Sequence, residues 1–164
     1  MIFIRSLVFI TLFSPLFTWA GDKQPELPDH AVGEILDKFH HAAAEADGKT
    51  YFSLFHPEGV FIGTDAGERW TVTEFQGYAQ PYFDQGKGWT YQPTSRHISI
   101  SSDKQFAWFD ELLWNDKYGQ CRGSGTLVKT ESGWRLMQYH LTFPIPNELA
   151  KEITEKIKAH TENK

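Results

Sequence analysis

Residues 89–143 decide the fold, and they read WTYQPTSRHISISSDKQFAWFDELLWNDKYGQCRGSGTLVKTESGWRLMQYHLTF. Four runs within this stretch are rich in aromatic and β-branched residues, which predicts strands at 89–101, 105–115, 118–130 and 134–143. The connections between these runs are only two or three residues long and consist of turn-forming residues. Links this short join neighbouring antiparallel strands. We therefore expect an antiparallel meander of four strands.

Helical patterns precede these strands. Apolar residues recur at three- and four-residue steps through 29–46, which predicts a helix, and a shorter helix at 49–56 and a brief strand at 60–62 follow. Thr71 and Glu74 have the spacing of a capping box, which begins a third helix. Helices followed by a curved sheet belong to the α+β class.

The chain also ends in a helical pattern. Leu149, Ile153 and Ile157 form a narrow apolar stripe behind Pro146, and Asn147 is placed to cap the helix. A stripe this narrow predicts a helix that packs on an edge of the domain or on a partner.

The first twenty residues have the layout of a cleavable signal peptide. One charge, Arg5, precedes an uncharged apolar run from Ser6 to Ala20 that ends in the acceptable cleavage site Thr18-Trp19-Ala20. This run is shorter than the roughly 20 residues that cross a bilayer comfortably, although an N-terminal anchor is the alternative interpretation. Cleavage after Ala20 predicts a periplasmic or secreted protein without a membrane attachment in its mature form.

The mature chain is expected to form one domain. Removal of 20 of the 164 residues leaves enough chain for one core, with a polar tether at 21–28 and the domain at 29–164. The net charge of −5 and the scattered Lys and Arg residues predict no nucleic acid partner. Cys121 is the only cysteine and is expected to be buried. The His residues lack metal-ligand spacing, so we expect no metal and no cofactor.

Several short segments have a distinctive sequence: Gly63-Thr64-Asp65, Glu68-Arg69-Trp70, Gly86-Lys87-Gly88-Trp89, Ala107-Trp108-Phe109-Asp110-Glu111, Gly123-Ser124-Gly125 and Tyr139-His140-Leu141. Together with the order of elements, they make the chain resemble the SnoaL-like domains of the nuclear transport factor 2-like superfamily, from about Asp29 to Asn147. The resemblance implies a cone of the nuclear transport factor 2-like or cystatin-like type. In such a cone N-terminal helices close one side of a curved antiparallel sheet around a pocket. Many members pair through the outer face of the sheet, which implies a homodimer.

The superfamily contains steroid isomerases, polyketide cyclases and dehydratases as well as non-catalytic binding or association modules, so the fold alone does not choose a function. In the steroid-isomerase pattern the oxyanion tyrosine falls at Phe39, and the protonated aspartate falls near Ser124 and Gly125. Both donors are therefore missing. Asp65 lies near the position of that pattern's base aspartate.

The parity of the strand at 105–115 divides its candidate residues. Successive side chains of a strand point to opposite faces, so Trp108 and Asp110 share one face while Phe109 and Glu111 share the other. Matching the isomerase pattern puts the Trp108 face inward. This makes Asp110 a carboxylate among aromatic rings, where burial would suit it to acid or base work. The alternatives are an Asp110 held in an ion pair or exposed on the outer face.

Arg96 and Arg122, on the neighbouring strands, are the expected partners of Asp110. Together with Asp110 and Trp108, these guanidinium groups would bind an anionic ligand such as a carboxylate. The alternative for each arginine is a solvated charge on the outer face.

Two further residues are candidates under the same alignment. The hydroxyl of Tyr139 would point inward and donate to a ligand, unless Tyr139 is simply a core residue. Asp65 would be a base at the mouth of the pocket, or the carboxylate of an Asx turn around Ala66-Gly67. His97 and His140 have the opposite parity and are expected on the outer face.

These observations leave two hypotheses. The first is an exported module that binds a small, partly apolar ligand, with an anionic group as one option, or that associates with another protein. The second is a cofactor-free isomerase, cyclase or dehydratase with Asp110 or Asp65 as its general base. The missing oxyanion donors favour the first hypothesis. A cone filled by aromatic side chains would leave only the association role.

Overall fold

The computed structural model describes residues 28–162, so the predicted signal peptide and nearly all of the tether lie outside the described residues. Within this part the chain forms an α+β domain, as expected. Its elements, in chain order, are α1 (Pro28–Ala44), α2 (Gly48–Ser53), β1 (Phe55–Ile62), β2 (Arg69–Thr71), α3 (Val72–Phe83), β3 (Gln92–Ile100), β4 (Phe106–Asn115), β5 (Gly119–Thr130), β6 (Gly133–Thr142), the short 3-10 helix η1 (Asn147–Leu149) and α4 (Ala150–Glu162).

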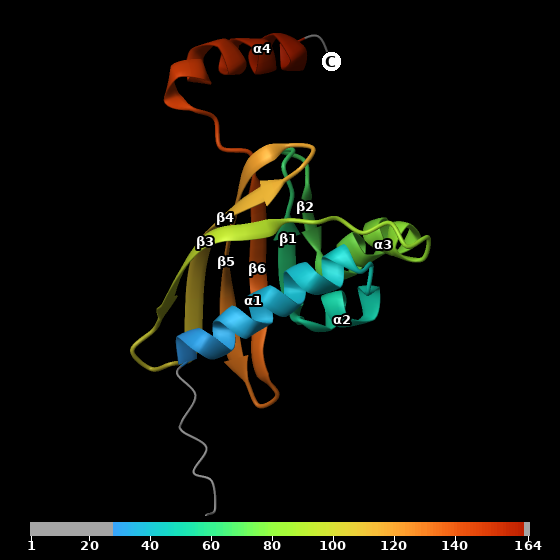
Figure 1. Cartoon of the computed structure of the whole chain (residues 1–164), viewed down its shortest axis with the longest axis vertical. Helices are drawn as coiled ribbons and strands as arrows, with labels where there is room; N and C mark the ends of the chain where they lie inside the picture. The colour runs from blue at the N-terminus through green and yellow to red at the C-terminus, as the bar shows by residue number, and fades with distance from the viewer. Residues whose placement is uncertain (1–27, 163–164) are drawn as a thin grey trace, which may run out of the picture.

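The strands form one sheet in the order β2-β1-β6-β5-β4-β3. The predicted meander is confirmed, because β3, β4, β5 and β6 pair with their neighbours in antiparallel fashion. β1 joins the other side of β6 in parallel and pairs with β2 in antiparallel fashion. The sheet is strongly bent, and Figure 1 shows α1 running diagonally across one of its faces.

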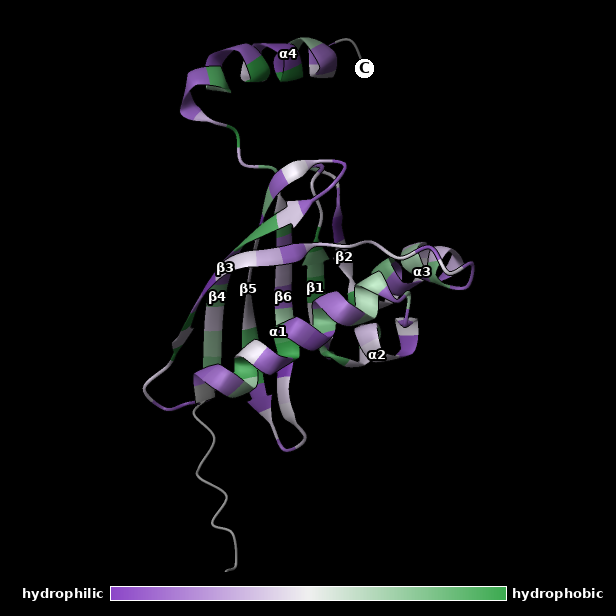
Figure 2. Ribbon diagram, in the orientation of Figure 1, coloured by the Kyte–Doolittle hydropathy of each residue, from purple (hydrophilic) through white to green (hydrophobic). Residues whose placement is uncertain are grey.

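Within residues 28–162 the helices α1, α2 and α3 close the concave side of the sheet and leave its other face uncovered. α1 contacts β3 and β6, α2 packs beside α1, and α3 contacts β1 and β2 at the same end of the domain. In Figure 2 the ribbon of β1 and much of α3 has the colour of hydrophobic residues, whereas hydrophilic and hydrophobic residues alternate along α1. None of the helices within residues 28–162 is long and apolar enough to cross a membrane.

The core is built from aromatic rings. The rings of Phe61 and Phe75 stack with their centroids 3.9 Å apart, and Phe39 stacks on Tyr51 at 4.5 Å. Val32, Leu36 and Phe39 present the apolar face of α1 to this core and are nearly or fully buried. Since each ring buries a large area, stacking of this kind supplies much of the stability of the domain.

The helix starts and turns follow the sequence closely at some positions. The capping box before α3 is present: the Thr71 hydroxyl accepts from the Glu74 backbone N–H, and the Glu74 carboxylate accepts from the Thr71 backbone N–H. Pro81 lies inside α3, which ends two residues later at Phe83. Cys121 is buried, as predicted, and burial raises the pKa of its thiol.

Two elements differ from expectation at the N-terminal half of the sheet. The second helix ends at Ser53 and β1 begins at Phe55, because Phe55 pairs with Leu136 before the register shifts and pairing resumes at Val60. Residues 57–59, which lie between the predicted helix and the predicted strand, therefore form an irregularity inside β1. β2 was not predicted, because three residues are too few to show a strand pattern without their partner β1.

α4 forms as predicted but stands apart from the domain. It buries none of its residues, and Figure 1 shows it beyond the end of the sheet, on a connection that carries two prolines. Leu149 in η1 and Ile157 in α4, both from the predicted apolar stripe, are each about half exposed, at 47% and 53%. Asn147 does not cap the helix with its side chain but begins η1.

Candidate functional site

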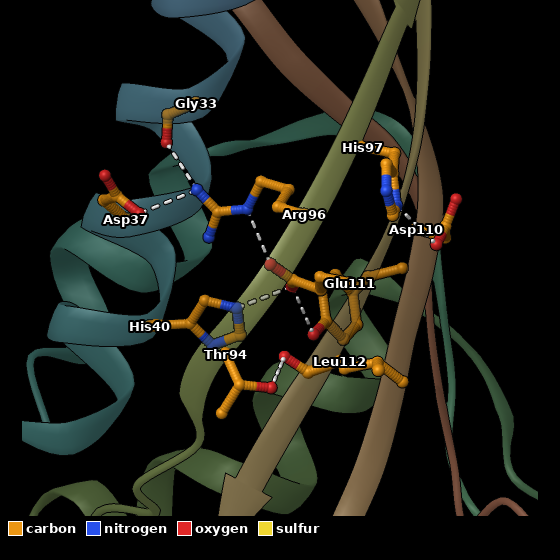
Figure 3. A network of polar contacts seen from close by, with 10 residues as sticks. Gly33, Asp37, His40, Thr94, Arg96, His97, Asp110, Glu111 and Leu112 are labelled. Carbon is orange, nitrogen blue, oxygen red and sulfur yellow. Dashed lines mark hydrogen bonds and ion pairs between the residues drawn. The ribbon is translucent and has the colours of Figure 1, made fainter.

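The parity of β4 is as predicted, but the direction of its faces is reversed. Glu111 is completely buried between α1 and the sheet, together with Phe109 and Leu113, whereas Trp108 and Asp110 lie exposed on the outer face. Among the described residues, the Asp110 carboxylate contacts the side chain of His97, whose Nδ1 lies 3.4 Å away. Figure 3 shows the two carboxylates on opposite sides of the strand. The expectation that Asp110 is a carboxylate inside the cone is wrong.

Glu111 is instead the centre of a buried polar cluster that joins α1 to three strands. His40 Nε2 lies 2.7 Å from its Oε1, and the Tyr139 hydroxyl donates to the same oxygen over 3.1 Å. Arg96 Nε donates to Oε2 over 2.8 Å. A second nitrogen of Arg96, Nη1, donates to the Asp37 carboxylate and to the Gly33 carbonyl on α1 (Figure 3).

The electrostatics of the cluster keep Glu111 ionised. Burial raises the pKa of its carboxyl, but the hydrogen bond and charge of His40 and the charge of Arg96 outweigh burial, so the pKa lies below its ordinary value. Burial lowers the pKa of Arg96, and the carboxylates of Glu111 and Asp37 more than compensate. Burial and the nearby Glu111 raise the pKa of Tyr139 well above its ordinary range, so Tyr139 remains a neutral donor.

Gly123 on β5 makes space for this cluster. A Cβ atom at this position would collide with the Tyr139 hydroxyl and with Glu111 Oε1. The glycine is therefore required by packing at the cluster, which gives the predicted Gly123-Ser124-Gly125 segment a structural explanation.

The structure brings together only two of the other predicted site residues, Arg96 and Tyr139. Arg96 and Tyr139 point inward and bind Glu111, whereas Arg122 and Trp108 are exposed on the outer face. Asp65 accepts a hydrogen bond from the Gly67 backbone N–H, which is the Asx turn considered as its alternative. The proposed trio of Asp110, Arg96 and Arg122 is thus not a site.

Sequence reasoning missed Glu111 and His40. The signal that could have found Glu111 is its pairing with a basic residue. Arg96 and Glu111 are direct partners on β3 and β4, and a buried acid needs such a partner. His40 follows Phe39 on the same helix and is 8% exposed. Among residues 28–162 no group of three His, Cys, Asp or Glu side chains could hold a metal ion.

The interior of the cone is nearly filled. A void of only about 10 Å³ remains between Phe39, His40, Tyr51 and Tyr139, which is space for one water molecule at most. The hydroxyl of Tyr51 lines this region and has no hydrogen-bond partner among the described residues. A small organic substrate therefore has no space beside Glu111 in this conformation.

The open space lies at the mouth of the cone. A groove of about 340 Å³, which we call the mouth groove, shares Phe61, Trp89, Tyr91 and Leu141 with the interior void. Two neighbouring grooves of about 320 and 390 Å³ open around Trp89 and Tyr118 but do not share Phe61 or Leu141 with the void. The mouth groove is thus the one of the three that continues deepest into the cone.

A ladder of nearly parallel rings leads from the polar cluster to the mouth groove. Tyr139 stacks on Phe61 with an angle of 11° between the rings, and Phe61 stacks on Phe75 at 13°. Trp70 continues the ladder against Phe75 at 8° and against Tyr78 at 18°. Tyr78 is half exposed, so the outer end of the ladder presents open ring surface to the groove.

The comparisons agree with this architecture. The family model of the SnoaL-like domain matches residues 32–146. No curated protein matches the sequence. Solved structures of low sequence identity share the fold. One is a protein of unknown function with a cystatin-like fold from Nostoc punctiforme, with 15% identity, a TM-score of 0.58 and coverage of 70% of this chain and 90% of that chain.

Two further structural relatives carry names that suggest enzymes. A candidate dehydratase of the nuclear transport factor 2-like family from Streptomyces avermitilis is 17% identical, with a TM-score of 0.59 over 72% of this chain and 96% of that chain. A candidate ketosteroid isomerase from Shewanella frigidimarina is also 17% identical, with a TM-score of 0.56 over 70% and 96%. At these identities they show the shared fold alone. The match to the family model, which covers most of the domain, shows that the chain belongs to the SnoaL-like domain family.

Proposed function

We propose that this protein is a binding module that holds a small, flat and largely apolar ligand in the mouth groove without transforming it. The observation that carries the proposal is the contrast between a mouth groove of about 340 Å³ and an interior void of about 10 Å³. The groove falls within the size of small-molecule sites and is walled by aromatic rings. The Trp70 and Tyr78 rings at the end of the ladder offer a surface on which a flat ligand can stack.

Catalysis by a general base has less support. Of the two predicted bases, Asp110 faces solvent on the outer face and Asp65 is engaged in a turn. The carboxylate that does face the interior, Glu111, accepts three hydrogen bonds and keeps a lowered pKa. A base needs a proton donor of the substrate within hydrogen-bond reach, and the packed rings around Glu111 leave no space for one.

A fluorescent binding assay tests the proposal. The neutral probe N-phenyl-1-naphthylamine should bind the mature protein with increased emission, and Tyr78→Ala and Trp70→Ala should each weaken its binding several-fold because they remove stacking surface. Tyr82→Ala is the matched control, since Tyr82 is an exposed tyrosine of the same helix that does not line the mouth groove. Equal binding by all four proteins would reject the groove as the site.

A second role, self-association, is favoured by one observation on the outer face of the sheet. Phe106, Trp108 and Trp114 alternate along β4 and are 53%, 51% and 48% exposed. Large exposed aromatic side chains in one row are typical of interaction surfaces. We propose a homodimer through this face. Analytical ultracentrifugation of wild type and Trp108→Lys tests it: a wild-type monomer at tens of micromolar would reject this role.

We further propose that the mature protein acts outside the cytoplasm. The support is the uncharged apolar run from Ser6 to Ala20, preceded by Arg5. Expression of the full chain followed by mass measurement of the exported protein should give a species that begins at Gly21. A full-length mass in the cell fraction would contradict export.

A further inference from the structure

We propose that the ligand of the mouth groove is an organic cation, such as a quaternary ammonium compound with an aromatic or apolar substituent. This inference rests on the proposed function, because it concerns the same groove. The observations that carry it are the ring surfaces of the groove, the single carboxylate within it and the distribution of charge around it.

The walls of the mouth groove present ring faces from four different elements of the chain. Trp70 comes from β2, Tyr78 from α3, Tyr118 from the turn between β4 and β5, and Phe143 from the end of β6. Tyr118 and Phe143 lie against each other with ring centroids 4.9 Å apart, and Trp70 and Tyr78 form a second pair at 5.2 Å. Ring faces carry negative quadrupole potential and attract cations, and quaternary ammonium groups are recognised by such aromatic surroundings.

Glu68 supplies the only ionisable carboxylate among the residues that line this groove, and the lining contains no Lys, Arg or His. Its Oε2 accepts a hydrogen bond from the Asp65 backbone N–H over 3.1 Å, which fixes the side chain against Gly63. Within residues 28–162 no basic side chain forms an ion pair with Glu68. The carboxylate is therefore held in place with its charge uncompensated by its neighbours.

The charge of Glu68 reaches the stacking surface. Burial is the main cause of the raised pKa of Tyr78, and the negative charge of Glu68 is a further cause. A cation seated over Trp70 and Tyr78 would thus meet both the ring faces and a carboxylate. An anion would meet the same groups with the opposite sign, so the groove discriminates against it.

An ammonium group of the protein already lies over one of these rings. Lys117 Nζ lies 4.8 Å from the centroid of the Tyr118 ring, in the two grooves that adjoin the mouth groove. Lys117 does not line the mouth groove itself. The rings at this end of the cone are therefore placed to bind positive charge, and one of them already does so with a charge of the protein.

Isosteric probes test the inference directly. Benzyltrimethylammonium and its neutral isostere neopentylbenzene have the same shape, so their difference in affinity reports the charge alone. Displacement of N-phenyl-1-naphthylamine should show at least about tenfold tighter binding of the cation, a ratio expected from a partly desolvated cation–π contact beside a carboxylate. Benzoate should not displace the probe.

Variants assign the effect to the groove. Glu68→Gln should weaken the cation about five- to tenfold and leave neopentylbenzene unchanged, whereas Glu131→Gln, an exposed charge in the β5–β6 turn, should change neither. Equal binding of the two isosteres, or binding of benzoate, would overturn the proposal that the ligand is a cation but would leave the mouth groove as a binding site. If none of the compounds binds and N-phenyl-1-naphthylamine also fails to bind, the proposed function falls together with this inference.

Discussion

Replacing Glu111 by glutamine tests whether the buried polar cluster fastens α1 to the sheet. The amide keeps the shape of the side chain but offers one acceptor oxygen where the carboxylate offers two. In the wild type, Oε1 of Glu111 accepts from His40 and Tyr139, and Oε2 accepts from Arg96. In the variant, the donors at one of these two positions therefore face the NH2 group of the amide instead of an acceptor oxygen. A hydrogen bond to a charged group contributes roughly 1.5–3 kcal/mol, and a buried charge that loses its partner costs more.

We therefore expect Glu111→Gln to lose about 3 kcal/mol of unfolding free energy, which lowers Tm by about 10 °C for a domain of this size. Urea unfolding followed by tryptophan fluorescence at pH 7 measures the loss. Asp110→Asn is the matched control on the preceding residue, where the exposed contact with His97 should contribute less than about 0.5 kcal/mol. A loss below about 1 kcal/mol for Glu111→Gln, or an equal loss for both variants, would refute the role of the cluster.

Three further predictions follow from the same structure. Because the pKa of Glu111 is lowered on folding, its charge stabilises the fold above its ordinary value of 4.5 and this contribution is lost as the pH falls below it. Urea titrations at about pH 7 and 3.5 should thus show that the lower pH reduces the unfolding free energy less in Glu111→Gln than in wild type; equal reductions would contradict this. Gly123→Ala should cost about 1–3 kcal/mol in thermal unfolding, whereas Gly77→Ala, with open space on α3, should gain up to about 1 kcal/mol. Truncation after Pro146 should change Tm by less than about 2 °C, since α4 buries no residue; a larger drop would mean that α4 packs on the domain.

Local patterns were sufficient for most of the fold. The four strands of the meander, the capping box at Thr71 and Glu74 and the final helix all depend on residues that are close in sequence, and each is present in the structure. β2 and the beginning of β1 depend on strand partners elsewhere in the chain. Phe55 becomes part of a strand because Leu136 lies beside it, and no pattern within 55–59 announces that pairing.

The candidate site failed at a step that periodicity cannot decide. Alternation along β4 separates Asp110 from Glu111 correctly, but a period of two does not show which of the two faces is the inner one. The match to the steroid-isomerase pattern placed the Trp108 face inward, whereas the interior face is Ala107, Phe109, Glu111 and Leu113. The buried acid was recognisable only through its partners, and His40 lies 71 residues away in the chain.

Because the two faces of β4 are reversed, the expected place of ligand binding and the expected charge of the ligand also change. With Asp110 and Arg122 outside and Arg96 bound to Glu111 and Asp37, the structure does not form the predicted anion site inside the cone. Glu111 binds His40, Arg96 and Tyr139, and Arg96 also binds Asp37 on α1, so these contacts hold the fold together. The proposed recognition then takes place in the mouth groove, which is lined by aromatic rings and the carboxylate of Glu68, and this lining is why we propose a positively charged ligand.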